Sequence, residues 1–325
     1  MQYVAQLFKI VDHMHEALLH GVPTTKRDIY YKDVRLFKSQ AVVDRLVDDV
    51  AATLDVGRAD LFVRASSKGL IAACGLTMHL KEGMLELNDA EGVLIPAAEE
   101  IVRFDLDELP SWVLIVEKEA VFQTLCRLRL ASHPALPGRG IIITGKGYPD
   151  VATRQLVKTL CDNLPDRQNT SIPILALVDG DAHGLDILSV YKYGSLSMQH
   201  ENERLVARKI KWLGIYTTEL AGLGLSKDEL IPINKHDEKK ALTMLRRPNL
   251  PKRWRYELQH MLHNRRKAEI EVLSLATQSM FISGCSGDGP RLGAQALNSL
   301  PPLMHYLIAK ISTHVAAERI ATGDQ

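Results

Sequence analysis

Three uninterrupted apolar runs in the middle of the chain constrain its fold most strongly. They span 112–116, 140–144 and 173–178, and each is followed by a stretch in which apolar residues recur at helical spacing. Buried strands that alternate with helices are typical of a parallel sheet, because each crossover helix returns the chain to the same end of the sheet. The sequence therefore predicts a mixed α/β fold with a parallel sheet in this region.

Acidic side chains follow two of these runs at the point where each strand would end. Glu117 ends the first run, and Asp179 and Asp181 end the third. The carboxyl ends of parallel strands share one sheet edge, where ligands usually bind. Three carboxylates gathered there repel one another unless a cation lies among them, and oxygen ligands without His or Cys favour Mg²⁺. Acids at strand ends also cap the helices that follow, and the residues alone leave that alternative open.

The N-terminal part of the chain has a different pattern. Apolar residues recur at helical spacing over 2–20, the motif Thr24–Tyr31 contains a helix start, and Ser39 precedes a third helix. Two short β-like runs at 61–64 and 70–73 enclose a Ser-Ser-Lys-Gly turn. Three helices followed by a hairpin are the order of a winged-helix domain.

The motif Thr24–Tyr31 ends in two adjacent tyrosines. Arg27 lies four residues before Tyr31 and shares its helical face. A guanidinium beside a phenol suits chemistry on a phosphate, because the cation binds the oxyanion and activates the phenol as a nucleophile. Tyr30 points about 100° away from Tyr31, so only one of the two faces a site. The alternative left open is a pair of half-buried tyrosines that pack a small domain.

Several basic residues near these motifs are candidates for contact with DNA. The exposed face of the predicted third helix is acidic, which disfavours base readout by that helix. The loop Gly145–Gly147 lacks the full phosphate-loop pattern and is interpreted as a tight turn. Residues 235–267 contain eleven Lys or Arg against three Asp or Glu, which suits a track along a DNA backbone. The candidate DNA-contacting residues are Lys26, Lys68, Lys146 and His183.

Composition limits the remaining possibilities. The formal net charge is +1, so nucleic-acid binding has to rest on local basic patches. The four cysteines form no CxxC pair, which argues against a zinc site or a disulfide framework and fits a reducing compartment. No signal peptide or membrane-length apolar run is apparent, so we expect a nuclear or cytosolic protein without a membrane partner.

Four motifs that occur in order carry a resemblance to a known family. They are Lys-Arg-Asp-Ile-Tyr-Tyr at 26–31, Val-Glu-Lys-Glu-Ala-Val-Phe at 116–122, Thr-Gly-Lys-Gly-Tyr-Pro-Asp at 144–150 and Asp-Gly-Asp-Ala-His-Gly at 179–184. Together they resemble the sporulation protein eleven family, the meiotic relatives of the A subunit of topoisomerase VI, over roughly residues 1–280.

The resemblance implies a winged-helix domain that bears a catalytic tyrosine, followed by a Toprim domain. It places the nucleophile at Tyr31 and implies that Arg27 assists at the phosphate. It also implies that Glu117, Asp179 and Asp181 hold Mg²⁺. The implied reaction joins Tyr31 to a DNA 5′-phosphate in each subunit of a homodimer, which makes a double-strand break that initiates meiotic recombination in the nucleus. The implied partners are double-stranded DNA, meiotic accessory proteins and a topoisomerase VI B-like subunit.

Two other functions remain open at this stage. One is a type IIB DNA topoisomerase A subunit that acts with an ATPase B subunit, and the other is a non-catalytic winged-helix scaffold that binds DNA. The expected domains are a winged-helix domain at 1–80, a connector at 81–110, a Toprim domain with its family extension at 111–276, and a tail at 277–325. We expect that tail to be divergent, or to reflect an altered reading of the end of the gene.

Overall fold

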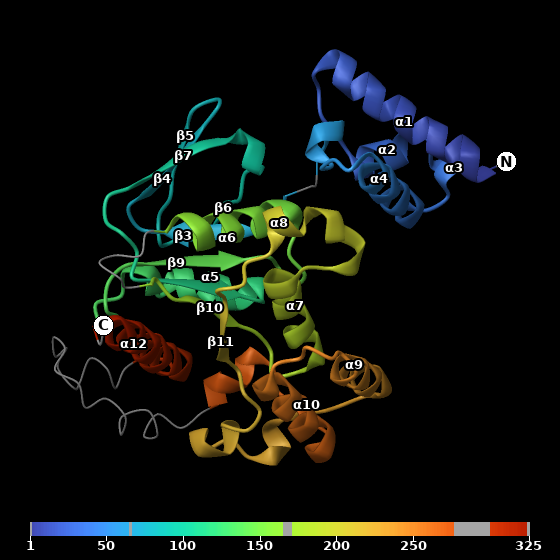
Figure 1. Cartoon of the computed structure of the whole chain (residues 1–325). Helices are drawn as coiled ribbons and strands as arrows, with labels where there is room; N and C mark the ends of the chain where they lie inside the picture. Colours follow the sequence, from blue (N-terminus) through green and yellow to red (C-terminus); the bar gives the residue numbers. More distant parts are fainter. Residues whose placement is uncertain (1, 65–66, 165–170, 276–299, 324–325) are drawn as a thin grey trace.

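The structure is a computed structural model that describes residues 2–64, 67–164, 171–275 and 300–323. A helical unit (residues 2–64) lies beside an α/β unit that begins at strand β3 and includes the C-terminal helix (Figure 1). Among the described residues, no helix combines the length and the apolar character needed to span a membrane. The predicted mixed α/β fold is confirmed.

The helical unit is built from three main helices and one short one. They are α1 (Gln2–His20), α2 (Lys26–Lys32), α3 (Val34–Phe37) and α4 (Gln40–Leu54). Their core contains Ile10, Ile29, Phe37 and Leu46, each of which is fully buried. The predicted order of helices is confirmed, although Ser39 makes no side-chain hydrogen bond at the start of α4.

The predicted wing hairpin is wrong. Strand β2 (Val63–Arg64) pairs in parallel with β1 (Thr24–Thr25), whereas β3 (Leu70–Ala73) pairs antiparallel with β9 in the central sheet. The physical reason is burial: all four residues of β3 are apolar and buried. A strand of this kind needs cover on both faces, which the central sheet provides and a solvent-facing wing does not.

The central sheet has six strands in the order β11-β10-β8-β9-β3-β6. Strands β8 to β11 are mutually parallel where they pair, and β3 and β6 add an antiparallel edge. The strands beyond β3 are β6 (Val93–Leu94), β8 (Trp112–Val116), β9 (Gly140–Thr144), β10 (Ile174–Leu177) and β11 (Lys211–Gly214). The parallel sheet expected from the apolar runs is therefore present.

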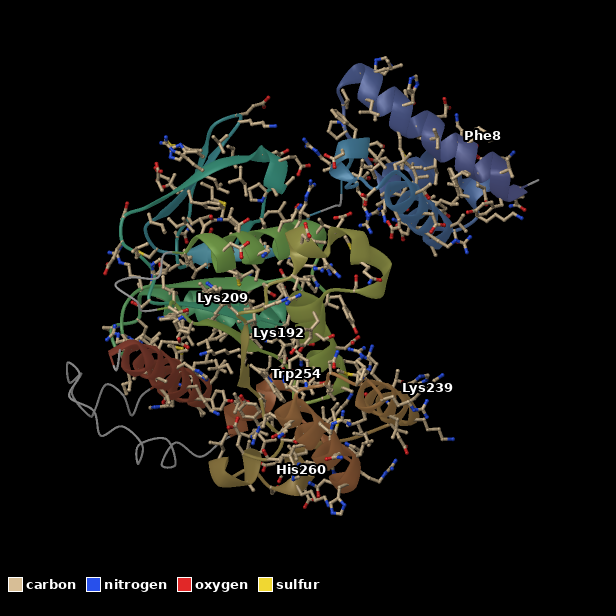
Figure 2. The ribbon with its side chains drawn as sticks, viewed as in Figure 1. Phe8, Lys192, Lys209, Lys239, Trp254 and His260 are labelled. Carbon is tan, nitrogen blue, oxygen red and sulfur yellow. The ribbon has the colours of Figure 1, made fainter. Side chains whose placement is uncertain are left out.

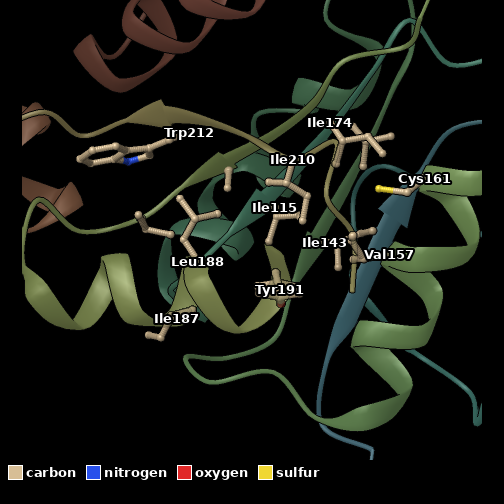
Figure 3. Packing of buried hydrophobic residues seen from close by; sticks show 14 of the residues in the cluster. Ile115, Ile143, Val157, Cys161, Ile174, Ile187, Leu188, Tyr191, Ile210 and Trp212 are labelled. Carbon is tan, nitrogen blue, oxygen red and sulfur yellow. The ribbon is translucent and has the colours of Figure 1, made fainter. Parts of the chain in front are cut away.

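Helices cover both faces of this sheet. The α-helices that follow its strands are α5 (Glu119–Arg127), α6 (Val151–Asn163), α7 (Ala182–Tyr193), α8 (Asn202–Leu205), α9 (Lys235–Leu245) and α10 (Lys252–Asn264). Ile115 and Ile143 face one side, where they pack with Val157 of α6 and Leu188 of α7 (Figure 3). The alternate residues of the strands face the other side and pack with α5 and the C-terminal helix.

Smaller elements complete the α/β unit. A separate antiparallel sheet contains β4 (Leu76–Leu80), β5 (Met84–Glu86) and β7 (Ile101–Leu106). A short antiparallel pair joins β12 (Ile231–Pro232) to β13 (Arg266–Lys267). The 3-10 helices are η1 (Ala59–Leu61) in the helical unit, then η2 (Ala98–Glu100), η3 (Leu130–Ser132), η4 (Leu196–Glu201), η5 (Leu220–Leu223), η6 (Lys227–Glu229) and η7 (Ile270–Leu275).

The C-terminal helix α12 (Pro302–Gly323) packs on the α/β unit. Leu307 and Ile311 are fully buried in the same apolar cluster as α5. Tyr306 Oη donates a hydrogen bond to Glu219 Oε1 at 2.6 Å, and Lys310 Nζ lies 2.5 Å from Glu219 Oε2. The last part of the expected 277–325 tail therefore forms a helix that contributes to the core. The rest of that tail, including Cys285, lies outside the described residues.

Candidate active site

The motif Thr24–Tyr31 begins just before α2 and continues through most of that helix. Thr25 caps this helix: its Oγ1 accepts a hydrogen bond from the Asp28 backbone N–H at 3.0 Å, and the Asp28 carboxylate accepts one from the Thr25 N–H. Tyr30 packs on the core of the helical unit, whereas Tyr31 is 61% exposed. The Arg27 guanidinium carbon lies 5.7 Å from the centroid of the Tyr31 ring. Arg27 and Tyr31 therefore form an exposed pair on one helical face.

The three acidic residues lie at the carboxyl edge of the central sheet. Glu117 follows β8, Asp179 lies two residues after the neighbouring strand β10, and Asp181 precedes α7. We call these three residues the acidic centre. Each is at least nine-tenths buried, and Glu117 Oε2 accepts a hydrogen bond from the Asp179 N–H at 2.9 Å. The parallel sheet thus brings together carboxylates that lie more than sixty residues apart in the chain.

Backbone N–H groups fix one oxygen of the other two carboxylates. Asp179 Oδ1 accepts a hydrogen bond from the Ile270 N–H at 2.9 Å. Asp181 Oδ1 accepts bonds from the N–H groups of His183 and Gly184, both at 2.8 Å, and so caps α7. The capping alternative left open by the sequence is therefore present at Asp181, and it uses only one of the two carboxylate oxygens.

Burial disfavours negative charge on Glu117 and Asp179. Burial raises the pKa of Glu117, and repulsion from the Asp179 carboxylate raises it further. Burial also raises the pKa of Asp179, although the Lys118 ammonium opposes that shift. The two carboxyl groups therefore bind protons more tightly than free carboxyl groups do, and a cation placed near them would favour their ionised forms.

The oxygen donors of the acidic centre are of the kind that a hard divalent cation binds. Within the described ranges, no three His, Cys, Asp or Glu side chains converge as a complete metal site. The donors are nevertheless all carboxylate oxygens, the ligands that Mg²⁺ prefers. A Cβ atom at Gly184 would lie 3.0 Å from Glu117 Oε2 and 2.4 Å from the Asp179 carbonyl oxygen. Only glycine leaves this space beside the carboxylates free.

Two of the predicted DNA-contacting lysines lie beside the end of β8. The Gly147 N–H donates to the Glu117 carbonyl at 2.9 Å, which holds the Gly145–Gly147 loop against that strand end. Lys146 Nζ lies 2.9 Å from Glu119 Oε1, and Lys68 Nζ donates to the Lys146 carbonyl at 3.2 Å. The structure therefore places Lys68 and Lys146 together near the acidic centre, and their contact with DNA stays a prediction.

The other two candidates are engaged within the protein. Lys26 Nζ lies 2.6 Å from Asp48 Oδ1, and only 15% of the Lys26 side chain is exposed. Burial lowers the pKa of this lysine. His183 is half-exposed, and its Nε2 lies 3.8 Å from Asp237 Oδ1. DNA contact by Lys26 therefore requires a change in an ion pair that joins α2 to α4.

The basic region at 235–267 is divided between structural and exposed residues. Five of its basic residues pair with carboxylates: Lys240, Arg247, Arg253, Arg265 and Lys267. Lys239 on α9 is exposed (Figure 2), whereas Trp254 on α10 is buried and packs edge-on against Tyr193 of α7, with 5.9 Å between the ring centroids. The exposed members of this region suit a backbone track, and the ion pair of Lys240 with Asp186 ties α9 to α7.

The sequence did not indicate the lysines that neutralise the acidic centre. Lys118 Nζ lies 3.2 Å from Asp179 Oδ2, and Lys267 Nζ lies 3.7 Å from Asp181 Oδ2. Lys118 stands next to Glu117 in the sequence, but adjacency alone does not show that its side chain turns towards Asp179. Lys267 lies in β13 and Asp181 at the start of α7, so no pattern of neighbouring residues predicts their contact.

Comparison with known proteins decides the family. Residues 112–283 match the Toprim domain of the family described as topoisomerase 6 A subunit/Spo11, and residues 2–63 match the family described as type IIB DNA topoisomerase. The chain belongs to the family of Spo11 and the topoisomerase 6 A subunits. The family resemblance of the sequence motifs is confirmed.

Individual relatives fall into two groups. The chain is similar to the meiotic recombination protein SPO11 of Homo sapiens, with 38% identity over 278 residues that cover 84% of this chain and 67% of the human protein. It is 36% identical to the meiotic recombination protein rec12 of Schizosaccharomyces pombe over 83% of this chain and 73% of that protein. It is also 34% identical to the DNA topoisomerase 6 A subunit of Arabidopsis thaliana over 82% of this chain and 60% of that protein.

Proposed function

We propose that this chain cleaves double-stranded DNA by transesterification and so initiates meiotic recombination in the nucleus. The observation that carries the proposal is the exposed pair of Tyr31 and Arg27 in a chain whose sheet edge also gathers the acidic centre. Its similarity to proteins named for meiotic recombination supports the meiotic role.

The chemistry assigned to Tyr31 exchanges one phosphoester for another. The Tyr31 Oη attacks a backbone phosphorus, a 5′-phosphotyrosyl bond forms, and the bond from phosphorus to the 3′-oxygen breaks. The phenol loses a proton and the leaving oxygen gains one, so the step needs no external reductant, oxidant or energy source. Arg27 binds a phosphate oxygen and stabilises the negative charge that develops on it.

We assign Mg²⁺ binding to Glu117, Asp179 and Asp181. When bound, the ion supplies positive charge to the phosphate and to the leaving 3′-oxygen. The fixed carboxylate oxygens and the space at Gly184 support this assignment, because they pre-organise an oxygen-lined position at the sheet edge. Lys68 and Lys146 are proposed to hold the DNA backbone beside it.

We infer that the active form is a homodimer. In the described part of the chain, no hydrogen bond or ion pair links Tyr31 or Arg27 to the acidic centre. A second copy of the chain would supply the missing half of each site, with the tyrosine of one copy acting at the carboxylates of the other. Two such sites cut both strands of a duplex. Meiotic accessory proteins and a B-like subunit are the proposed partners in assembling them.

A type IIB topoisomerase A subunit is the second candidate function. The similarity to the DNA topoisomerase 6 A subunit of Arabidopsis thaliana favours it, and both functions use the same residues for cleavage. They differ after the cut, because a topoisomerase reseals the duplex. Relaxation of supercoiled DNA with an ATPase B subunit would support this candidate over a break-forming enzyme. The exposed Tyr31 beside Arg27 argues against a non-catalytic scaffold.

Covalent capture tests the proposed cleavage. The chain, its partners, duplex DNA and Mg²⁺ are incubated, denatured and examined for DNA that stays attached to protein. We expect an adduct with the wild-type chain and with Tyr30→Phe, and none with Tyr31→Phe or without metal. Normal DNA binding with no adduct under any condition would contradict the proposal and favour the scaffold.

A further inference from the structure

The Lys118 ammonium contacts Asp179 Oδ2, the carboxylate oxygen that a metal ion at the acidic centre would need. Its Nζ lies 3.2 Å from Asp179 Oδ2. The other oxygen of this carboxylate, Oδ1, already accepts a hydrogen bond from the Ile270 N–H. A divalent cation that binds Asp179 therefore competes with the lysine ammonium for Oδ2.

Two further carboxylates hold the same ammonium on its other side. Lys118 Nζ lies 3.0 Å from Glu269 Oε2 and 2.7 Å from Glu271 Oε2, and both distances are shorter than the one to Asp179. The side chains of Glu269 and Glu271 are 43% and 51% exposed, compared with 10% for Asp179. The lysine thus has a second set of partners that lies further towards solvent than the acidic centre.

The same arrangement recurs at Asp181. Lys267 Nζ lies 3.7 Å from Asp181 Oδ2 but 3.1 Å from Asp237 Oδ1, which is outside the acidic centre. At both aspartates, a lysine touches the free carboxylate oxygen while a different carboxylate holds it more closely. The repetition indicates that these lysines balance the charge of the acidic centre without being bound permanently to it.

We propose that Lys118 is a built-in counterion, which moves from Asp179 to Glu269 and Glu271 when a divalent cation binds at the acidic centre. This inference rests on the proposed metal site. An ammonium and a divalent cation repel each other strongly at contact distance in a poorly hydrated site, so the two cannot share Asp179 Oδ2. Lys118 therefore neutralises the carboxylates in the metal-free protein and weakens the binding of metal by competition.

The decisive experiment measures metal affinity in the absence of DNA. Mn²⁺ binding to the full chain is followed by electron paramagnetic resonance, with Mg²⁺ as competitor. We expect Lys118→Met to bind metal about tenfold more tightly than the wild type, since the competing charge is gone. Lys118→Arg should stay close to the wild type because it keeps that charge. Lys158→Met is the matched control, since Lys158 pairs with Asp162 on the surface of α6.

The opposite sign would overturn the inference. If Lys118 only fixed the position of Asp179, Lys118→Met would bind metal more weakly. If the wild type bound no metal and Glu117→Gln behaved in the same way, both the proposed metal site and the inference would fail. If the wild type bound metal and Lys118→Met bound it no more tightly, the inference alone would fail.

A double-mutant cycle separates the roles of the two glutamates. Replacing Glu269 and Glu271 together by Gln leaves Lys118 with Asp179 as its remaining carboxylate partner among those described, so metal binding should weaken several-fold. In the Lys118→Met background the same replacement should have little effect, because no ammonium needs a second position. Equal weakening in both backgrounds would show that the glutamates act on the metal independently of Lys118, which contradicts the exchange.

Discussion

The C-terminal helix α12 provides the sharpest test of the fold, because it lies outside the residues that match the two family descriptions. Ile311 is fully buried in the cluster that α12 shares with α5. Ile311→Ala removes three carbon atoms at about 0.8 kcal/mol for each buried CH₂, and the cavity that remains adds to this cost. We expect the free energy of unfolding to fall by about 2–5 kcal/mol.

Tryptophan fluorescence during denaturation by urea measures this effect. All three tryptophans, Trp112, Trp212 and Trp254, belong to the α/β unit, so their signal does not report on the helical unit. Ile320→Ala is the matched control, because Ile320 lies on the same helix and is 68% exposed. Its effect should stay within about 0.5 kcal/mol. An Ile311→Ala protein as stable as the control would refute the assignment of α12 to the folded core.

Three further predictions concern charge. Contacts with Lys240, Tyr148 and Arg247 offset burial and lower the pKa of Asp186 from 3.8 to about 2. Asp186→Asn should therefore cost about 2 kcal/mol at neutral pH in urea titrations, and the difference should vanish as pH falls from above 3.8 through the folded pKa of about 2. An unchanged difference there would contradict this. The raised pKa of Glu117 means that its contribution to the stability of the metal-free protein falls as pH rises from 4.5 towards about 8. Mg²⁺ should stabilise the protein more at the upper end of this range in thermal melts, and equal stabilisation throughout would contradict that expectation. Lys26→Met removes the ion pair with Asp48 and should therefore destabilise the helical unit, measured as a lower melting temperature by circular dichroism. A residue that only contacts DNA would, when replaced, weaken DNA binding and leave that temperature unchanged.

The parallel strands were predictable because burial on both faces leaves a local signal. The runs at 112–116 and 140–144 coincide with β8 and β9, since a strand covered on both sides has no polar alternation to obscure its ends. Strand β3 shares this apolar character, but the good turn that precedes it favours a hairpin when only neighbouring residues are considered. Its true partner, β9, lies far along the chain, and local turn chemistry does not specify that pairing.

The candidate site was predictable only as far as strand topology determines it. Glu117 and Asp179 were expected at one sheet edge because parallel strands end together. Which oxygen each backbone N–H binds, and which lysine faces each carboxylate, depends on tertiary packing. Lys118 meets Glu271 across 153 positions of sequence, and no spacing rule describes such a contact. The burial of Lys26 was missed for the same reason, because Asp48 lies on a different helix.

Mass spectrometry of the DNA adduct identifies the nucleophilic tyrosine. Trypsin cleaves after Arg27 and Lys32, so both tyrosines fall in the peptide Asp28–Lys32. After nuclease digestion of the trapped complex, fragmentation of this peptide locates the residual nucleotide. We predict a nucleotide joined to the Tyr31 Oη through its 5′-phosphate. The same nucleotide on Tyr30, or cleaved DNA without any modified peptide, would contradict the assignment of Tyr31 as the nucleophile.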